Sequence, residues 1–175
     1  FKSDKSIGQR FTDFIKWVME IIFSKRTSVE EVEEGKSFQP KFDENGLIPV
    51  ITIDNEDNQV LMHGYMNEEA LKSSIKTKMS HYWSRSRKKI WKKGETSGFF
   101  QNIVKIQIDD DQDCIILFVK LLGTKASCHV GYKSCFYREL EKKGEKFSTN
   151  LVFNEKKKVF DPNEVYKGLE NPTKL

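Results

Sequence analysis

The chain has 175 residues, with 30 basic and 26 acidic side chains and a formal net charge of +4. This length is enough for one domain with a sizeable core, and the 37% hydrophobic content excludes an intrinsically disordered chain. The near balance of charges does not require a polyanionic partner, although local basic segments can still bind phosphate.

The N-terminal part is predicted to be a helical extension. Residues 8–23 carry apolar side chains at helical spacing, which predicts one amphipathic helix. The apolar run is too short and too often interrupted by charge to span a membrane, so docking on the domain or on a second subunit is expected. Residues 24–40 are polar and rich in glutamate, as in a linker or a short exposed helix. The apolar positions of the predicted helix are Phe11, Phe14, Ile15, Val18, Ile21 and Ile22.

Apolar runs bounded by turn residues predict a β-rich core from about residue 40. Asn67 is a good helix N-cap, and two acidic residues follow it, so one main helix is expected after it. Strands are expected at residues 47–54, 60–66, 80–91, 99–109 and 114–122.

These elements predict an α+β, β-rich fold with a twisted or barrel-like mixed sheet and one main helix, besides the N-terminal amphipathic helix. We divide the chain into an N-terminal helical extension and linker (1–39), a core domain (40–140) and a lysine-rich C-terminal tail (141–175). The tail is too short for an independent domain, and one short helix is expected after Asp161 and Pro162.

The three cysteines indicate a reduced protein. A disulfide framework favours an even number of cysteines, and the sequence shows no secretory signal peptide. We therefore expect a cytoplasmic protein whose thiols are free to bind metal or to pack in the core.

Four aspartates lie within residues 109–113, between two predicted strands. In an extended chain Asp109, Asp111 and Asp113 share one face, where their carboxylates repel each other unless a cation such as Mg²⁺ binds. A calcium loop of the EF-hand type is excluded, because its glycine and glutamate positions hold Cys114 and Lys120. The alternative is an exposed acidic hairpin turn, since aspartate often caps its own backbone in turns.

Cys128 and Cys135 are seven positions apart, with His129 between them. Thiolate, imidazole and carboxylate are the ligands that zinc takes in proteins. The spacing is wider than in a zinc knuckle, so two buried structural thiols are the alternative. Gly123 and Gly131 favour a connection that curls back and brings the two thiols together.

A basic segment, "WSRSRKKIWKKGETSG", combines cations, two tryptophans and a loop of glycine and hydroxyl side chains. Cations, hydroxyl donors and close backbone approach together suit phosphate groups. The alternatives are a solvated strand edge and a nucleic-acid surface, in which aromatic rings stack on bases. The candidate phosphate ligands are Arg85, Arg87, Lys93, Glu95, Thr96 and Ser97.

Taken together, these segments resemble phosphoribosyl-AMP cyclohydrolase, a family of L-histidine biosynthesis. The matching stretches are "GLIPVITID", "VLMHGYMNEEAL", "HYWSRSRKKIWKKGETSG", "QNIVKIQIDDDQD" and "CHVGYKSCFYREL". They follow the order of the family over roughly residues 40–140, and "YWSRSR", "WKKGETSG" and "SCFYR" are distinctive for it. The resemblance implies a homodimeric hydrolase that uses zinc and usually Mg²⁺ and opens the purine ring of phosphoribosyl-AMP between N1 and C6. It implies a small nucleotide as the substrate, without nucleic acid or membrane as a partner.

The resemblance also implies the metal ligands. The family motif D-C-D-x-D supplies three magnesium ligands, which correspond to Asp109, Asp111 and Asp113, and its cysteine joins two later cysteines around zinc. Those later cysteines correspond to Cys128 and Cys135. In this chain the motif cysteine is replaced by Asp110, which puts the third zinc ligand in doubt.

Three completions of the zinc site are open: Asp110 through oxygen, Cys114 by its equal strand parity, or His129. Asp110 is favoured because it keeps the position of the family cysteine and is expected to point in the direction opposite to the other three aspartates. A carboxylate in place of a thiolate should leave the zinc more Lewis acidic and less tightly held.

The implied chemistry is attack of water, activated by zinc, on purine C6. His129, beside Cys128, is the first candidate for the general base and His81 the second. The alternative role of His129 is to orient the site without reacting. The segment with Arg85, Arg87 and Lys93 is expected to hold phosphate and ribose.

The rival hypothesis is a non-catalytic nucleotide or nucleic-acid binding module on the same fold, with a weakened zinc site. The replacement of the motif cysteine by Asp110 is the feature that keeps this rival open.

Overall fold

The structure is a computed structural model that describes residues 7–173, without the side chains of residues 17–19. Its helices are α1 (Ile7–Met19), α2 (Val29–Glu34), α3 (Glu68–Thr77) and α4 (Pro162–Val165). Its strands are β1 (Ile48–Asp54), β2 (Val60–Met66), β3 (His81–Ser84), β4 (Lys89–Lys92), β5 (Gln101–Ile108), β6 (Ile115–Leu121), β7 (Arg138–Lys143) and β8 (Lys146–Phe153).

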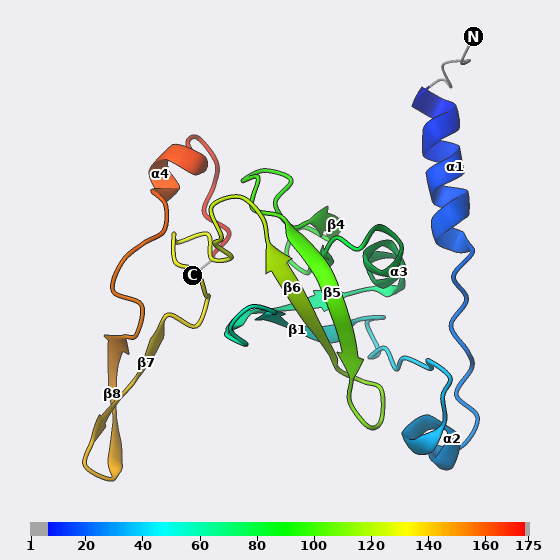
Figure 1. Ribbon diagram of the computed structural model, residues 1–175, viewed down its shortest axis with the longest axis horizontal. Helices are drawn as coiled ribbons and strands as arrows, with labels where there is room; N and C mark the ends of the chain where they lie inside the picture. Colours follow the sequence, from blue (N-terminus) through cyan, green and yellow to red (C-terminus); the bar gives the residue numbers. More distant parts are fainter. Residues whose placement is uncertain (1–6, 174–175) are drawn as a thin grey trace.

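A four-stranded mixed sheet forms the centre of the molecule, in the order β2-β1-β6-β5 (Figure 1). The pairs β1–β2 and β5–β6 are antiparallel, whereas β1 and β6 run parallel. The prediction of a β-rich α+β fold with a mixed sheet is therefore confirmed. The barrel-like alternative is wrong, because the sheet is open with β2 and β5 as its edges.

The core lies where the central strands meet α3. Alternate residues of β1 and β6 are buried, as expected for strands with one face against the core. The N-cap of α3 is Asn67, whose side chain accepts a hydrogen bond from the Ala70 amide, as the sequence predicts. Leu71 of this helix is completely buried beside Ile48 and Leu117.

Residues 80–91 form a hairpin rather than the single expected strand. β3 and β4 pair antiparallel, with His81 opposite Lys92 at one end and Ser84 opposite Lys89 at the other. Ser84 accepts hydrogen bonds from the amide and the side chain of Arg87 and so holds the turn between the strands. The basic segment therefore forms two short strands joined by a turn.

A chain of buried hydrogen bonds crosses from the sheet to the hairpin. The Tyr82 hydroxyl donates to Gln101 Oε1 at 2.7 Å and lies 2.7 Å from Thr52 Oγ1. Gln101 Nε2 in turn donates to Ser127 Oγ at 3.2 Å. Burial raises the pKa of Tyr82 to about 12, which keeps this hydroxyl protonated. These hydrogen bonds link the core to the segment that carries Cys128.

The C-terminal part returns to the sheet after a protruding hairpin. β7 and β8 form a two-stranded ribbon that projects from the body in Figure 1. The sequence pattern did not predict this ribbon. The short helix after Asp161 is confirmed as α4, with the Asp161 side chain accepting from the Asn163 amide. The segment after β8 runs back toward the body and into α4 (Figure 1), and its Phe160 packs on Phe99 with ring centroids 4.7 Å apart.

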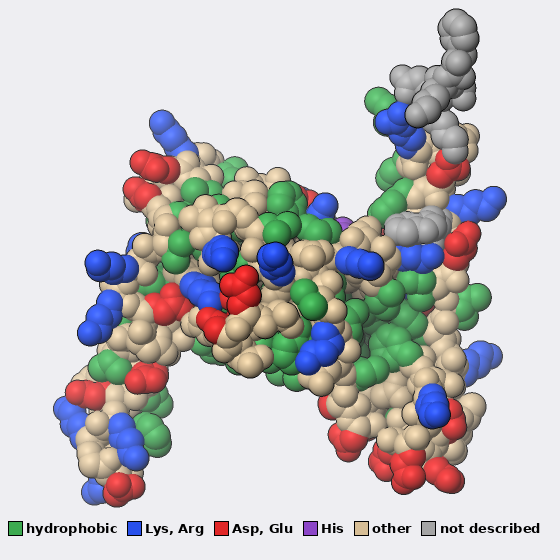
Figure 2. All heavy atoms as spheres, viewed as in Figure 1, with side chains coloured by type: hydrophobic (Ala, Val, Ile, Leu, Met, Phe, Trp, Pro, Cys, Tyr) green, Lys and Arg blue, Asp and Glu red, His purple; other side chains and the backbone are tan. Residues whose placement is uncertain are grey.

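The helix α1 stands beside the body, and apolar side chains line the hollow between them (Figure 2). Phe14 and Ile15 of α1 and Leu47 and Trp83 of the body are among the residues that line a groove of about 760 Å³. Phe11 is 64% exposed, so α1 does not bury its whole apolar set in this chain. Val18 belongs to the predicted face, but its side chain is outside the described residues. Docking on the domain or on a second subunit stays a prediction.

Within residues 7–173 no helix combines the length and the apolar character that crossing a membrane requires.

Candidate functional site

The structure brings Cys128 and Cys135 together at the end of the sheet near α4. A tight turn carries Cys128: the Ser127 amide donates to Lys133 O at 2.9 Å, and the Cys128 amide donates to Tyr132 O at 3.1 Å. The amide of Cys135 donates to Leu61 O at 2.7 Å, which fixes the second thiol to β2. Cys128 is buried and Cys135 is exposed, so the pair opens to the surface on one side.

The two thiols share one proton. A hydrogen bond from Cys135, nearby backbone amides and the charge of Lys93 together lower the pKa of Cys128 to about 6, against the effect of burial. The same hydrogen bond, desolvation of the thiol by neighbouring atoms and the negative charge of Cys128 raise the pKa of Cys135, although the residue as a whole is exposed. At neutral pH the pair therefore carries a thiolate at Cys128 and a thiol at Cys135.

Lys93 extends from the end of β4 toward the thiols. Its Nζ donates to the Ser127 carbonyl at 2.6 Å. Burial lowers the pKa of Lys93, whereas the charges of Cys135 and Cys128 raise it. The placement brings a cation from the basic segment to the thiol pair.

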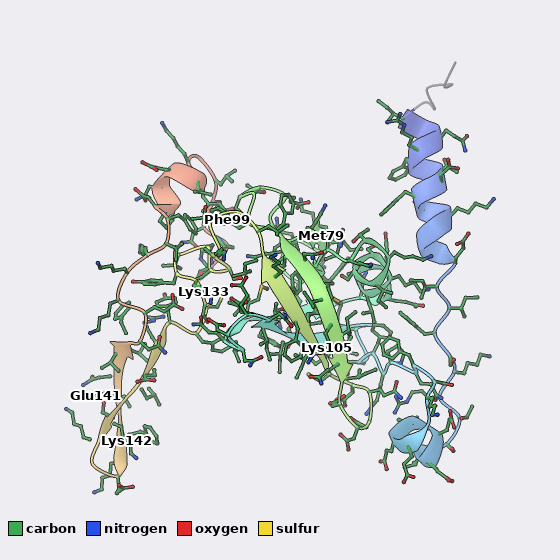
Figure 3. The ribbon with its side chains drawn as sticks, in the orientation of Figure 1. Met79, Phe99, Lys105, Lys133, Glu141 and Lys142 are labelled. Atoms are coloured by element: carbon green, nitrogen blue, oxygen red, sulfur yellow. The ribbon has the colours of Figure 1, made fainter. Side chains whose placement is uncertain are left out.

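The loop of residues 94–98 lies at the same end of the molecule. Gly94 has φ +93°, and a Cβ at this position would meet the Phe100 amide nitrogen at 2.6 Å, so only glycine fits. The Gly98 amide donates to Gly94 O at 2.7 Å and closes the loop, and Ser97 Oγ accepts from the Phe99 amide at 3.2 Å. Figure 3 shows Phe99 and Lys133 on the side of the sheet that faces α4.

His129 is half-buried next to Cys128. Burial lowers the pKa of His129, and the positive charge of Lys93 lowers it further, against a hydrogen bond with Asn171 that raises it. The ring is therefore neutral near pH 7, as a general base requires.

His81 belongs to β3, opposite Lys92. Its Nδ1 lies 2.7 Å from Met79 O, and burial lowers its pKa as well.

The acidic residues form a turn rather than an extended strand. β5 ends at Ile108, and Asp109 Oδ1 accepts from the amides of Asp113 and Cys114 at 3.0 Å each. The expected extended backbone is therefore wrong, although Asp111 and Asp113 still lie on one side, 3.6 Å and 3.5 Å from Lys41 Nζ. Carboxylate oxygens of Asp109, Asp110 and Asp111 lie within 4.8 Å of one another, so Asp110 faces the same side as its neighbours. The expectation that Asp110 points away from the other aspartates is therefore wrong, because the turn brings its carboxylate back beside theirs.

Lys41 offsets part of the negative charge of this turn. Its Nζ lies 3.6 Å from Asp111 and 3.5 Å from Asp113. Burial, followed by the neighbouring aspartates, raises the pKa of the Asp113 carboxyl, against the effect of Lys41. Burial and the charges of Asp109 and Asp113 also raise the pKa of Cys114, which makes it a poor source of thiolate.

The acidic turn and the thiol pair lie at opposite ends of β6. The turn leads into Ile115, and Leu121 at the other end leads toward Cys128. A strand of seven residues spans about 23 Å at the usual rise. Within one chain Asp110 therefore does not join Cys128 and Cys135.

The candidate phosphate ligands of the basic segment also lie at two opposite ends, those of the β3–β4 hairpin. Arg85 and Arg87 are exposed at the turn of the β3–β4 hairpin, where Arg85 lies over the Tyr65 ring at 4.2 Å. Lys93, Glu95, Thr96 and Ser97 follow the opposite end of the hairpin. One chain thus places Lys93, and not the two arginines, near the thiols.

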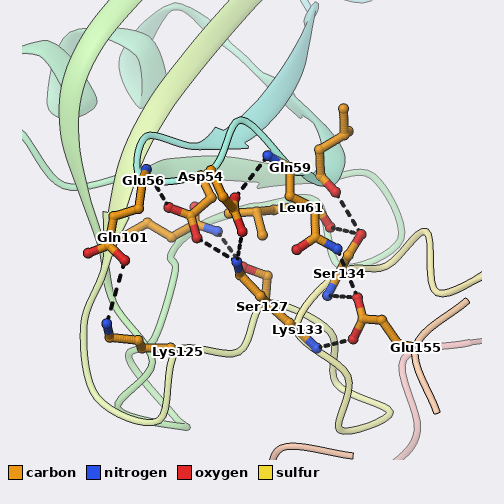
Figure 4. Close-up of polar contacts among 12 residues, drawn as sticks. Asp54, Glu56, Gln59, Leu61, Gln101, Lys125, Ser127, Lys133, Ser134 and Glu155 are labelled. Atoms are coloured by element: carbon orange, nitrogen blue, oxygen red, sulfur yellow. Dashed lines mark hydrogen bonds and ion pairs between the residues drawn. The ribbon is translucent and has the colours of Figure 1, made fainter. Parts of the chain in front are cut away.

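Three residues of the C-terminal tail lie at the thiol end without having been predicted there. Glu155 accepts hydrogen bonds from the amides of Lys133 and Ser134 at 2.9 Å each (Figure 4). Tyr166 shares a hydrogen bond with Ser97, and Asn171 shares one with His129. The sequence carries a signal for the helix cap at Asp161, but none for these long-range contacts.

Comparisons with known proteins identify the family of this chain. Residues 62–137 match the family model described as phosphoribosyl-AMP cyclohydrolase. A phosphoribosyl-AMP cyclohydrolase of Brucella canis is 46% identical over 134 residues, which cover 77% of this chain and 96% of the relative. One of Rhizobium rhizogenes is 46% identical over 150 residues, which cover 85% of this chain and 99% of the relative. One of Brucella anthropi is 50% identical over 109 residues, which cover 62% of this chain and 77% of the relative. The chain therefore belongs to the phosphoribosyl-AMP cyclohydrolase family.

Proposed function

We propose that this protein hydrolyses phosphoribosyl-AMP in histidine biosynthesis and opens the purine six-membered ring between N1 and C6. Water adds to C6 and the C6–N1 bond breaks. The oxygen of the water becomes the carboxamide oxygen of the product, and a proton ends on N1. The observation that carries the proposal is the paired thiols of Cys128 and Cys135 beside Lys93 and the 94–98 loop, in a chain of this family.

The donor set at the thiol pair fits zinc. Cys128 supplies a thiolate near neutral pH, and Cys135 can lose its proton when a cation replaces it. Bound zinc would supply a Lewis acid that lowers the pKa of water. The clustered carboxylates of Asp109, Asp110 and Asp111 fit a hard cation such as Mg²⁺, with Asp113 beside them.

The third zinc ligand is assigned to Asp110 of a second subunit. One chain keeps Asp110 and the thiols at opposite ends of β6, so a shared site requires two copies of the chain. A homodimer in which the acidic turn of each subunit approaches the thiols of the other satisfies this requirement. It would also bring Arg85 and Arg87 of one subunit within reach of substrate held by the other.

The protein groups have separate tasks in this proposal. His129 accepts a proton from the attacking water, since its neutral ring lies next to Cys128. Lys93 and the hydroxyls of Thr96 and Ser97 hold phosphate and ribose oxygens. His81 lies on the neighbouring hairpin and is the second candidate for proton transfer. The free thiols fit the reducing conditions of the cytoplasm, where we expect the enzyme to work.

The assay of purified protein with phosphoribosyl-AMP tests the proposal. We expect turnover in buffer with zinc and Mg²⁺ and its loss in excess chelator, with recovery on return of zinc. Absence of turnover in metal-replete buffer would contradict the proposed activity. Binding of phosphoribosyl-AMP or of single-stranded nucleic acid without turnover would support the non-catalytic rival.

A further inference from the structure

The β7–β8 ribbon has one apolar face and one polar face. Side chains alternate between the two faces of a strand, so Phe147 and Leu151 of β8 lie on one face, together with Leu140, which pairs with Leu151. On the opposite face, the Glu141 carboxylate accepts a hydrogen bond from Ser148 Oγ at 3.1 Å. The polar contacts of the ribbon are therefore separated from its apolar side chains.

The apolar face of the ribbon is exposed in one chain. The exposed fraction is 69% for Phe147 and 50% for each of Leu140 and Leu151. Within residues 7–173 neither strand pairs with a strand outside the ribbon, which projects from the body (Figure 1). A two-stranded hairpin alone is marginally stable in water, and a contiguous exposed apolar face marks an interaction surface. The ribbon therefore requires a surface that covers this face.

The groove between α1 and the body matches this face in character. Its volume is about 760 Å³, and apolar side chains line the hollow in Figure 2. The lining also includes Glu68, Glu69 and Lys72, and Glu68 pairs with Lys72 at 2.8 Å. Two carboxylates against one ammonium give this part of the lining a net negative charge. The apolar side chains belong to Phe14, Ile15, Leu47 and Trp83.

The charge of the ribbon complements that of the groove. Arg138 and Lys142 lie two positions to either side of Leu140 on β7 and therefore share its face. Lys142 Nζ lies 3.9 Å from a carboxylate oxygen of the fully exposed Glu145, and such a surface pair contributes little. Cations beside an apolar face thus match a groove that is apolar and carries the exposed carboxylate of Glu69.

The positions of the two surfaces fit the dimer of the proposed function. The ribbon begins at Arg138, shortly after Cys135, at the thiol end of the sheet. β1 begins directly after Leu47 of the groove and runs parallel to β6, which begins after the acidic turn, so the groove and the acidic turn lie at the same end. A dimer in which each acidic turn approaches the thiols of the other subunit therefore brings each groove toward the other subunit's ribbon.

One chain does not fill its own groove. The ribbon and α1 lie on opposite sides of the body in Figure 1, and Figure 3 places Glu141 and Lys142 on the projecting ribbon. We propose that the apolar face of the ribbon packs into the α1 groove of a second copy of this chain, with two equivalent contacts related by two-fold symmetry. The relative placement of the two chains rests on the proposed function, whereas the two surfaces are features of one chain. Both α1 and the ribbon lie outside the region 62–137 that matches the family model.

The photocrosslinking amino acid p-benzoylphenylalanine in place of Phe147 tests the contact in the full chain. Labelled (¹⁵N) and unlabelled chains are mixed at low concentration, concentrated and irradiated. Mass spectrometry should find crosslinks between a labelled and an unlabelled peptide, the second peptide containing residues 14–15, 47 or 83 of the groove. The same amino acid at Val152, on the opposite face of β8, is the matched control and should not reach the groove.

The crosslinks decide between the possible occupants of the groove. Crosslinks from position 147 to the groove that join only peptides of equal label would show a contact within one chain and overturn the proposal. Crosslinks to another segment of the second chain, or none, would overturn it as well.

Self-association of two matched variants gives a second readout. Leu151→Ser removes an apolar side chain from the docking face and should raise the dissociation constant of the dimer about tenfold. Val152→Ser, at the next position on the opposite face, should leave this constant unchanged. Analytical ultracentrifugation measures both, and urea denaturation at concentrations where both variants are monomeric checks that they fold equally well. Equal dissociation constants of the two variants, or a wild type that is monomeric at every concentration, would contradict the docking.

Turnover of phosphoribosyl-AMP separates this inference from the proposed function. If crosslinks between two chains reach the groove but the wild type shows no turnover, the proposed function fails and the docking stands. If the wild type turns over substrate while the crosslinks miss the groove, the docking fails and the proposed function stands.

Discussion

Lys93 Nζ donates a 2.6 Å hydrogen bond to the carbonyl of Ser127, the residue directly before Cys128. This bond joins the basic segment to the thiol turn and brings a positive charge to the pair. Two segments that are separate in the sequence, "WKKGETSG" and "CHVGYKSC", therefore lie together in the structure.

The first prediction concerns that charge. Lys93→Met should raise the pKa of Cys128, because the variant removes a cation that stabilises the thiolate. A smaller thiolate fraction at pH 7 should slow alkylation of Cys128 in metal-free protein severalfold. Mass spectrometry after iodoacetamide treatment measures the rate, and Lys92→Met is the control. Equal rates for Lys93→Met and the wild type would show that the lysine does not act on the thiol.

The second prediction concerns the third zinc ligand. Asp110→Ala should lower zinc content and turnover, because the family position of the missing cysteine holds this carboxylate. Cys114→Ala should change neither, since burial and Asp109 and Asp113 raise the pKa of its thiol. Metal analysis by mass spectrometry gives the zinc stoichiometry of both variants. Loss of zinc in Cys114→Ala alone would reverse the assignment.

Much of the local structure could be predicted from short sequence signals. Asn67 and Asp161 cap α3 and α4 as expected, because a cap depends on residues two or three positions away. The apolar runs of β1 and β6 also predicted strands. Their parallel pairing and the open edges of the sheet depend on contacts between distant segments, which periodicity does not encode.

The acidic residues show why part of the site could not be predicted. Alternating faces follow from an extended backbone, but Asp109 closes a turn by accepting from two later amides. The proximity of the two thiols was easier to predict, because Gly131 allows the turn that brings Cys128 near Cys135. Contacts of the tail with His129 join positions more than forty residues apart in sequence, and no local pattern marks them.

The third prediction concerns Glu155, which supports the turn between the thiols. Its carboxylate accepts from the amides of Lys133 and Ser134 and from Gln59 Nε2 at 3.1 Å (Figure 4). Glu155→Ala leaves these donors without their acceptor and should lower the free energy of unfolding by about 1–3 kcal/mol. Urea denaturation measures this loss, with exposed Lys156→Ala as the control. A loss no larger than in the control would exclude the supporting role.

The fourth prediction concerns pH. A hydrogen bond from Lys133 lowers the pKa of Asp57 below 3.8, its value without interactions. The folded pKa lies below the unfolded value, so the ion pair stabilises the fold above the unfolded pKa. This contribution is lost as pH falls through the folded pKa. Asp57 is half-exposed, so its contribution should be about 0.5 kcal/mol.

Thermal denaturation of the wild type and Asp57→Asn at several pH values measures this difference. We expect the wild type to be more stable at pH 7 and the two melting temperatures to converge in acid. A stability difference that grows toward low pH would contradict the sign of the shift.

Incorporation of water oxygen into the product tests the central claim most directly. Zinc-loaded protein incubated with phosphoribosyl-AMP in ¹⁸O-labelled water should yield a ring-opened product with one ¹⁸O in its carboxamide group. The double variant Cys128→Ser and Cys135→Ser should form this product only at the uncatalysed rate. Absence of the labelled product with the wild type, or equal formation by the double variant, would contradict hydrolysis at the thiol site.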